Sequence, residues 1–139
     1  MEEQGYKKLE IYRMAHHLAV DIHRMTTALP RHELFEEGGQ IRRSSKSVAA
    51  QIVEGYCLRN HKNEFLQYLN RAFASCHETV EHLELLYETG SLSDESLYKH
   101  LLEDYNRLCR MIYRFIAGVS AEHITPTFVR EGSEESGEG

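Results

Sequence analysis

The chain has 139 residues, of which 41% are hydrophobic, and this length and composition predict one globular domain with a single core. The formal net charge is −6, but residues 120–139 carry −4 of it, which leaves −2 on the other 119 residues. The acidic total counts mildly against nucleic acid. A near-neutral body neither requires nor excludes a polyanionic partner, however, because local clusters of cations matter more than the total.

The three cysteines, Cys57, Cys76 and Cys109, are widely spaced and lie in apolar helical patterns rather than in metal-ligand pairs. We therefore expect reduced thiols in an intracellular protein. The N-terminus has no apolar run followed by a cleavage site, and no segment has the roughly 18 apolar residues that span a bilayer. The sequence thus predicts a soluble, cytoplasmic protein without a membrane partner.

Apolar residues at alternating steps of four and three predict a first amphipathic helix from about residue 6 to residue 28, which Pro30 ends. Its inward seam is expected to contain Ile11, Ala15, Leu18, Ile22, Met25 and Leu29. In the connection that follows, Leu34 and Phe35 are expected to cover the end of the bundle.

The same spacing predicts three further helices, which end near residues 58, 90 and 118. Glu36 and Glu37 lie favourably at the start of the first of these, where Gly38 and Gly39 loosen the boundary, and the other two begin near residues 62 and 93. Ser93, Asp94 and Glu95 are typical of an N-cap followed by first-turn acids. Short connections and the lack of an alternating strand pattern predict an all-α fold, an antiparallel up-down four-helix bundle over residues 6–119. Residues 120–139 are expected to form an acidic, flexible tail.

The segment from residue 40 to residue 56, QIRRSSKSVAAQIVEGY, has two adjacent apolar strips on one helix. The spacing of Ile41, Ser45, Val48 and Ile52 predicts the core-facing strip, and the second contains Ala49, Val53 and Tyr56. Such a helix buries more surface than one bundle interior requires. We therefore expect a partner surface on the second helix.

Five cations lie on or just beyond this helix: Arg42, Arg43, Lys46, Arg59 and Lys62. The first three lie near the helix N-terminus, where the backbone dipole disfavours positive charge. A role beyond local stability is therefore expected, and nucleic-acid binding through phosphate contacts is one interpretation. The alternative is salt bridges to Glu33, Glu36 or Glu37, or to a neighbouring subunit.

A second stripe of cations, Arg107, Arg110 and Arg114, lies on the fourth helix, where Glu103 is spaced to pair with Arg107. Structural roles are expected for these arginines, because cations suit a helix C-terminus. Nucleic-acid contact is the alternative.

The segment HETVEH at residues 77–82 superficially resembles a zinc-protease helix, but Glu81 occupies the position of the second histidine ligand. His77 with Glu81, and Glu78 with His82, are instead expected to form surface pairs. No phosphate-binding loop or activated nucleophile appears in the sequence. We therefore expect no metal, no cofactor and no enzymatic activity, with metal-dependent hydrolysis at these four residues as a minor alternative.

Several motifs together resemble a known bacterial family. They are Leu9, Tyr12, Ile22, Pro30, Glu33, the run QIRRSSKSV, Ile52–Gly55, Arg59, Glu64, Phe65, Ala72, Ser75 and Glu78. Over about residues 6–119 the chain resembles the four-helix-bundle proteins encoded in intervening sequences of 23S rRNA genes. That family is similar in fold to the accessory variability determinant proteins of diversity-generating retroelements. Those proteins form pentameric barrels with a basic surface and assist a reverse transcriptase and its RNA.

The resemblance implies a homopentamer with RNA or DNA, and a reverse transcriptase, as partners. It implies a basic surface at Arg42, Arg43 and Lys46, with Arg59 and Lys62 as less direct matches. The chain departs from the family pattern at three places: Gln51 replaces the usual Asn, Val53 an Ala, and Ala74-Ser75 a Gly-Ser pair. Added side-chain volume at these positions is expected to alter helix spacing or subunit registry.

Together, these features predict a non-enzymatic oligomeric scaffold whose basic second helix binds RNA or a nucleoprotein. The alternative is a protein–protein interaction module without nucleic-acid binding, in which the same cations form salt bridges between protomers.

Overall fold

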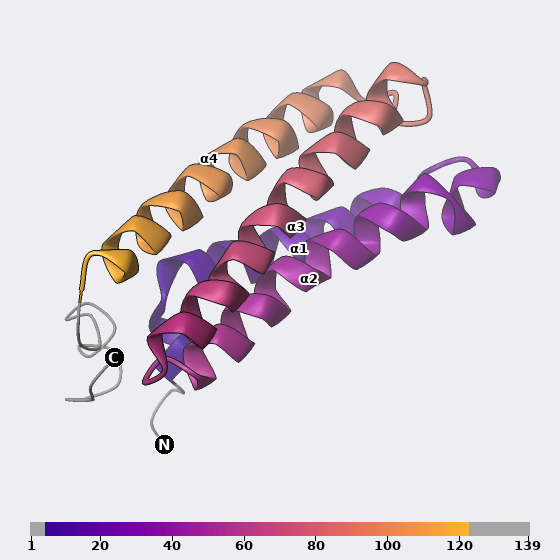
Figure 1. Ribbon diagram of the computed structural model, residues 1–139. Helices are drawn as coiled ribbons and strands as arrows, with labels where there is room; N and C mark the ends of the chain where they lie inside the picture. Colours follow the sequence, from indigo (N-terminus) through magenta and orange to yellow (C-terminus); the bar gives the residue numbers. More distant parts are fainter. Residues whose placement is uncertain (1–4, 123–139) are drawn as a thin grey trace.

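The computed structural model describes residues 5–122, and all regular elements in this range are helical. The four long helices are α1 (Glu10–Thr26), α2 (Glu37–Cys57), α3 (Lys62–Glu88) and α4 (Glu95–Ser120). Two short 3-10 helices, η1 (Gly5–Lys8) and η2 (Arg31–Phe35), precede α1 and α2. The helices run up and down a bundle, so that η1 and the end of α4 lie at the same end (Figure 1). The predicted all-α four-helix architecture is confirmed, whereas most of the predicted tail, residues 123–139, lies outside the described residues.

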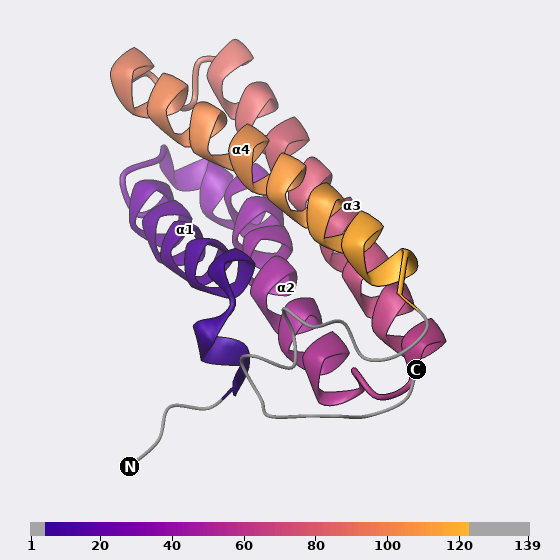
Figure 2. The same cartoon turned by 90° about the vertical axis from the view of Figure 1, so that its left-hand side faces the viewer.

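The four helices do not pack equally against one another. α2 makes its most extensive contact with α3, while α1 packs mainly on α2, and α4 mainly on α3. The α1–α4 contact is much smaller, and Figure 2 shows these two helices separated along one side of the bundle. The contact between α1 and α4, which we call the α1–α4 seam, is therefore the loosest between neighbouring helices.

Small residues allow the close α2–α3 contact. The Oγ of Ser44 lies 2.8 Å from the Oγ1 of Thr79, and the Oγ of Ser47 lies 3.0 Å from that of Ser75. A Cβ added at Gly55 would meet the Cβ of Tyr68 at 3.1 Å, so this glycine is needed for close approach rather than for backbone freedom. The buried hydroxyls satisfy one another, which removes the cost of burying them.

The predicted core seams are largely confirmed. Every residue predicted for the inward seam of α1 is buried, as is the core strip of α2. Tyr56 from the second strip is also buried, and its ring packs against that of Tyr6 in η1 at a centroid distance of 6.5 Å. Part of the surplus apolar surface of α2 is thus covered within the chain. In α3, Thr79 and Leu86 are buried, whereas the neighbouring Val80 and Tyr87 are only half-buried.

Two local predictions were wrong. Phe35 does not cover the bundle end, because 89% of its surface is exposed. The N-cap of α4 is Asp94 rather than Ser93, and the Asp94 side chain accepts a hydrogen bond from the backbone N–H of Leu97 at 3.0 Å. The second helix begins at Glu37, as predicted, and Gly38 packs so closely on the carbonyl of Glu33 that no side chain would fit.

Candidate nucleic-acid interface

Arg42, the first of the five predicted site residues, takes part in the fold itself. Its Nη2 donates a hydrogen bond to the carbonyl of Leu34 at 2.6 Å, and the guanidinium lies over Gly38 and Gly39. Because neither glycine has a side chain, the arginine can reach back across the first turn of α2. Arg42 therefore ties η2 to α2 and is only half-exposed.

Arg59 and Lys62 lie at the opposite end of α2 and also contact their own chain. The guanidinium of Arg59 lies 4.1 Å from the ring centroid of Tyr56 and donates to the Tyr56 carbonyl at 3.0 Å. Lys62 donates from Nζ to the carbonyls of Ser120 and Glu122 at the end of α4. At about 1.5 Å of helix rise per residue, the end of α2 at Cys57, beyond which these two cations lie, is roughly 16 Å from Lys46. The five predicted residues therefore do not form one cluster.

Arg43 and Lys46 are the fully exposed members of the predicted set. They are three residues apart, so they project from the same face of α2. Arg43 donates to the side-chain carbonyl of Gln40 on that face. In residues 5–122 neither Arg43 nor Lys46 forms an ion pair with Glu33, Glu36 or Glu37, so the predicted salt-bridge alternative does not hold within this chain.

Lys46 lies on a groove between α1 and α2 with a volume of about 450 Å³. We call it the α1/α2 groove and define it by its lining residues: His16, Ala19, Val20, His23, Arg24, Lys46 and Ala49. Alanine and valine form an apolar floor, and Val20 is 37% exposed. Two cations and two histidines surround this floor, an arrangement that suits phosphates at the rim and apolar ligand atoms between them.

The sequence reasoning missed His16, His23 and Arg24 as members of this surface. His16 and His23 are seven residues apart, and Val20 lies between them, so an outward-facing strip of α1 was visible in the periodicity. What the sequence did not show is that this strip faces Lys46 and Ala49 across the α1–α2 contact.

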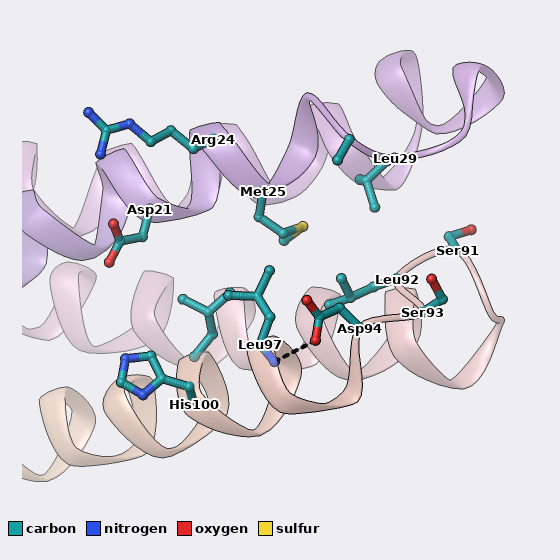
Figure 3. A pocket seen from close by; sticks show the side chains of 12 residues that line it. Asp21, Arg24, Met25, Leu29, Ser91, Leu92, Ser93, Asp94, Leu97 and His100 are labelled. Carbon is teal, nitrogen blue, oxygen red and sulfur yellow. Dashed lines mark hydrogen bonds between the residues drawn. The ribbon is translucent and has the colours of Figure 1, made fainter.

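A second cavity, of about 470 Å³, lies in the α1–α4 seam, between the end of α1 and the start of α4 (Figure 3). Asp21 points from α1 toward α4, whereas Arg24 points away from the cavity (Figure 3). His100 on the α4 wall lies 3.3 Å from Asp104 on the same helix. Leu29, Leu92 and other apolar residues line the deeper part, so this cavity is suited to a side chain rather than to an anion.

The histidines of α3 have structural contacts. Nδ1 of His82 lies 2.6 Å from Glu37 in the first turn of α2, and its Nε2 lies 3.3 Å from Glu78. The predicted Glu78–His82 pair is thus confirmed, but His82 is largely buried rather than on the surface, with 14% of its side chain exposed. His77 packs edge-on against the ring of Phe73 instead of pairing with Glu81. Over the described part of the chain, no group of three or more ligand-type side chains is placed to hold a metal ion.

The arginines of α4 lie on the outer face of the bundle. Arg107 pairs with Asp104 at 3.8 Å rather than with the predicted Glu103. Arg110 and Arg114 flank a hollow between α3 and α4. None of the helices in residues 5–122 is long and apolar enough to cross a bilayer.

Comparison with known proteins identifies the family. The sequence pattern of the 23S rRNA-intervening sequence proteins matches residues 7–114. The chain belongs to this family. The intervening sequence protein is also similar to a crystal structure, at 1.70 Å resolution, of a protein of unknown function from the S23 ribosomal protein family of Bacteroides thetaiotaomicron VPI-5482. That match has a TM-score of 0.69 and 26% identity, and covers 77% of this chain and 95% of the other.

No curated protein sequence matches this intervening sequence protein. The comparisons therefore establish the family and the helical fold. The predicted similarity to retroelement accessory proteins, and the homopentamer that it implies, stay predictions.

Proposed function

We propose that this intervening sequence protein is a non-enzymatic, oligomeric scaffold that binds RNA through the α1/α2 groove. The observation that supports the proposal is that two cations, Lys46 of α2 and Arg24 of α1, line the same groove, whose floor is apolar. Within residues 5–122 neither cation is neutralised by an ion pair, so both are available to phosphates. Arg43, one turn before Lys46, extends the basic surface along α2.

Oligomerisation supplies what one protomer lacks. The two cations of the groove, with Arg43 beside it, give only a few phosphate contacts, which is weak binding at physiological salt. Repeating the groove around a homopentamer multiplies these contacts on one RNA and raises the overall affinity without any new chemistry. A nucleoprotein such as a reverse transcriptase with its RNA would present many phosphates to the repeated grooves.

Light scattering of the purified protein, with and without a structured RNA, tests assembly and binding together. We expect a pentamer-sized species that gains the mass of RNA at low salt and releases it as the salt concentration rises. A stable oligomer that never gains mass from RNA would contradict RNA binding, and a monomer would contradict the scaffold.

The second candidate function is a protein–protein interaction module without nucleic acid. The cavity in the α1–α4 seam favours it, because its walls combine apolar depth with a polar rim of Asp21 and His100. A partner helix would place an apolar side chain in this cavity. Substituting Leu97, which lines the cavity, by Glu would then abolish partner binding and leave any RNA binding intact. Lys46→Glu, as the matching variant, would instead abolish RNA binding and leave partner binding intact.

A further inference from the structure

Two of the three cysteines meet in the core between α3 and α4. The sulfur of Cys109 lies 2.8 Å from that of Cys76, both thiols are free, and Cys76 also donates to the carbonyl of Tyr105 at 3.6 Å. A disulfide bond is about 2.05 Å long, so a movement of less than about 1 Å would join the two sulfurs. The fold thus holds a dithiol at bonding range.

One sulfur of this pair borders the surface. Cys109 is 4% exposed and lines the hollow between α3 and α4, whereas Cys76 is fully buried behind it. The hollow has a volume of about 450 Å³ and is lined by Phe73, His77, Asn106, Cys109, Arg110, Tyr113 and Arg114. Because so little of Cys109 is accessible, only a small oxidant can reach its sulfur.

We propose that Cys109 and Cys76 form a peroxide-reactive dithiol, in which Cys109 is the sulfur attacked through the hollow and Cys76 the resolving thiol. Hydrogen peroxide is the substrate that the narrow access admits, whereas a bulky disulfide such as oxidised glutathione is excluded. The product is a disulfide that joins α3 to α4.

The electrostatics assign the two roles. The hydrogen bond with Cys76 lowers the pKa of Cys109, and the positive charge of Arg110 lowers it further, against the opposing effect of burial. The hydrogen bond with Cys109 and burial raise the pKa of Cys76. The thiolate is therefore favoured on the cysteine that lines the hollow.

The reaction balances without another reactant. The thiolate sulfur of Cys109 forms a bond to one peroxide oxygen, the O–O bond breaks, and the departing hydroxide takes a proton to become water. Peroxide is reduced by two electrons, and Cys109 becomes a sulfenic acid. The sulfur of Cys76 then bonds to that of Cys109, the S–O bond breaks, and hydroxide leaves with the proton of Cys76 as a second water.

Peptide mapping by mass spectrometry under non-reducing conditions tests the proposal, in a Cys57→Ser background that removes the exposed cysteine. Hydrogen peroxide is expected to convert the protein to a form lacking two hydrogens, with Cys76 and Cys109 in one linked peptide that dithiothreitol separates. Oxidised glutathione at the same concentration is expected to react at least about tenfold more slowly, because access to Cys109 is narrow. Equal rates with both oxidants, or no linked peptide, would overturn the proposal.

Two variants separate the roles. With Cys76→Ser, peroxide is expected to leave a sulfenic acid on Cys109, since the resolving thiol is gone. Mass spectrometry detects it as the gain of one oxygen atom on the Cys109 peptide. With Arg110→Gln, disulfide formation is expected to slow by about threefold or more, because thiolate character falls. Sulfenic acid on Cys76 in a Cys109→Ser variant, at the rate seen for Cys109, would reverse the assignment and contradict access through the hollow.

Discussion

Lys62 in the first turn of α3 donates a hydrogen bond from Nζ to the carbonyl of Ser120, the last residue of α4, at 3.0 Å. Its positive charge therefore lies at the negative end of the α4 dipole and satisfies a carbonyl that has no partner within the helix. The two residues are 58 positions apart in the chain. A cation that the sequence suggests for phosphate binding thus holds the ends of two helices together.

Replacing Lys62 by Met is expected to lower the free energy of unfolding by about 1 kcal/mol, because the capping hydrogen bond and the dipole interaction are lost. Urea denaturation measures the change. Lys46→Met is the matched control and is expected to change stability by less than about 0.5 kcal/mol, since Lys46 is exposed. Equal effects of the two substitutions would contradict the structural role of Lys62.

Arg42→Ala is expected to lower the free energy of unfolding by about 1.5 to 2 kcal/mol, because its guanidinium donates a charge-assisted hydrogen bond to the Leu34 carbonyl. The neighbouring Arg43→Ala is expected to be nearly neutral. Thermal unfolding of both variants distinguishes Arg42, which holds η2 against α2, from Arg43, which is exposed. A larger loss for Arg43→Ala would refute this division.

Two glycines in α2 give a matched pair of predictions. At Gly55 a Cβ would lie 3.1 Å from the Cβ of Tyr68 and 3.4 Å from the Cδ1 of Phe65, so Gly55→Ala must push α2 and α3 apart. We expect a net loss of about 1 kcal/mol, in which the overpacking exceeds the gain in helix propensity. At Gly39 the nearest atom would be the Leu34 carbonyl oxygen at 3.5 Å, an ordinary contact.

Gly39→Ala is therefore expected to raise the free energy of unfolding by about 0.5 to 1 kcal/mol through helix propensity alone. Denaturant titrations of both variants give the comparison. If both alanine substitutions stabilise the protein, the claim that α2 and α3 are in close contact at Gly55 is contradicted.

Tyr105 gives the expected pH dependence of stability. Burial raises the pKa of its phenol well above the usual value near 10, so the folded protein keeps the proton that the unfolded chain releases. This contribution is fully present below about pH 10 and is lost as the pH rises above it. The free energy of unfolding of the parent protein is expected to fall between about pH 8 and about pH 10.5. For Tyr105→Phe this fall is expected to be smaller, because the group that titrates is gone.

The sequence was sufficient for the helices and their core seams, because periodic residues such as Ile22 and Ile52 report which face is buried. It left the start of α2 loosely defined because glycine has low helix propensity, whereas the packing of Gly38 on Glu33 decides the local structure. It did not separate Lys46 from Lys62, since the distinction depends on which carbonyls come near in space. The α1 side of the groove was missed for the same reason, as Arg24 meets Lys46 only once the helices pack.

The most direct test of the account is RNA affinity measured over a series of salt concentrations, for the parent protein and two triple variants. The first variant, Arg24→Gln, Arg43→Gln and Lys46→Gln, removes the basic groove. The second, Arg71→Gln, Lys99→Gln and Arg107→Gln, removes the same charge from exposed positions on α3 and α4. Light scattering first establishes that all three proteins have the same mass.

For the parent and the α3/α4 variant, we expect the affinity to fall steeply with salt. For the groove variant, the slope of log affinity against log salt is expected to be shallower than that of the parent. With single-stranded RNA the difference is about two for each protomer that contacts the RNA, because three phosphate contacts are lost. An affinity that persists at high salt, or an equal loss in both variants, would contradict RNA binding through the α1/α2 groove.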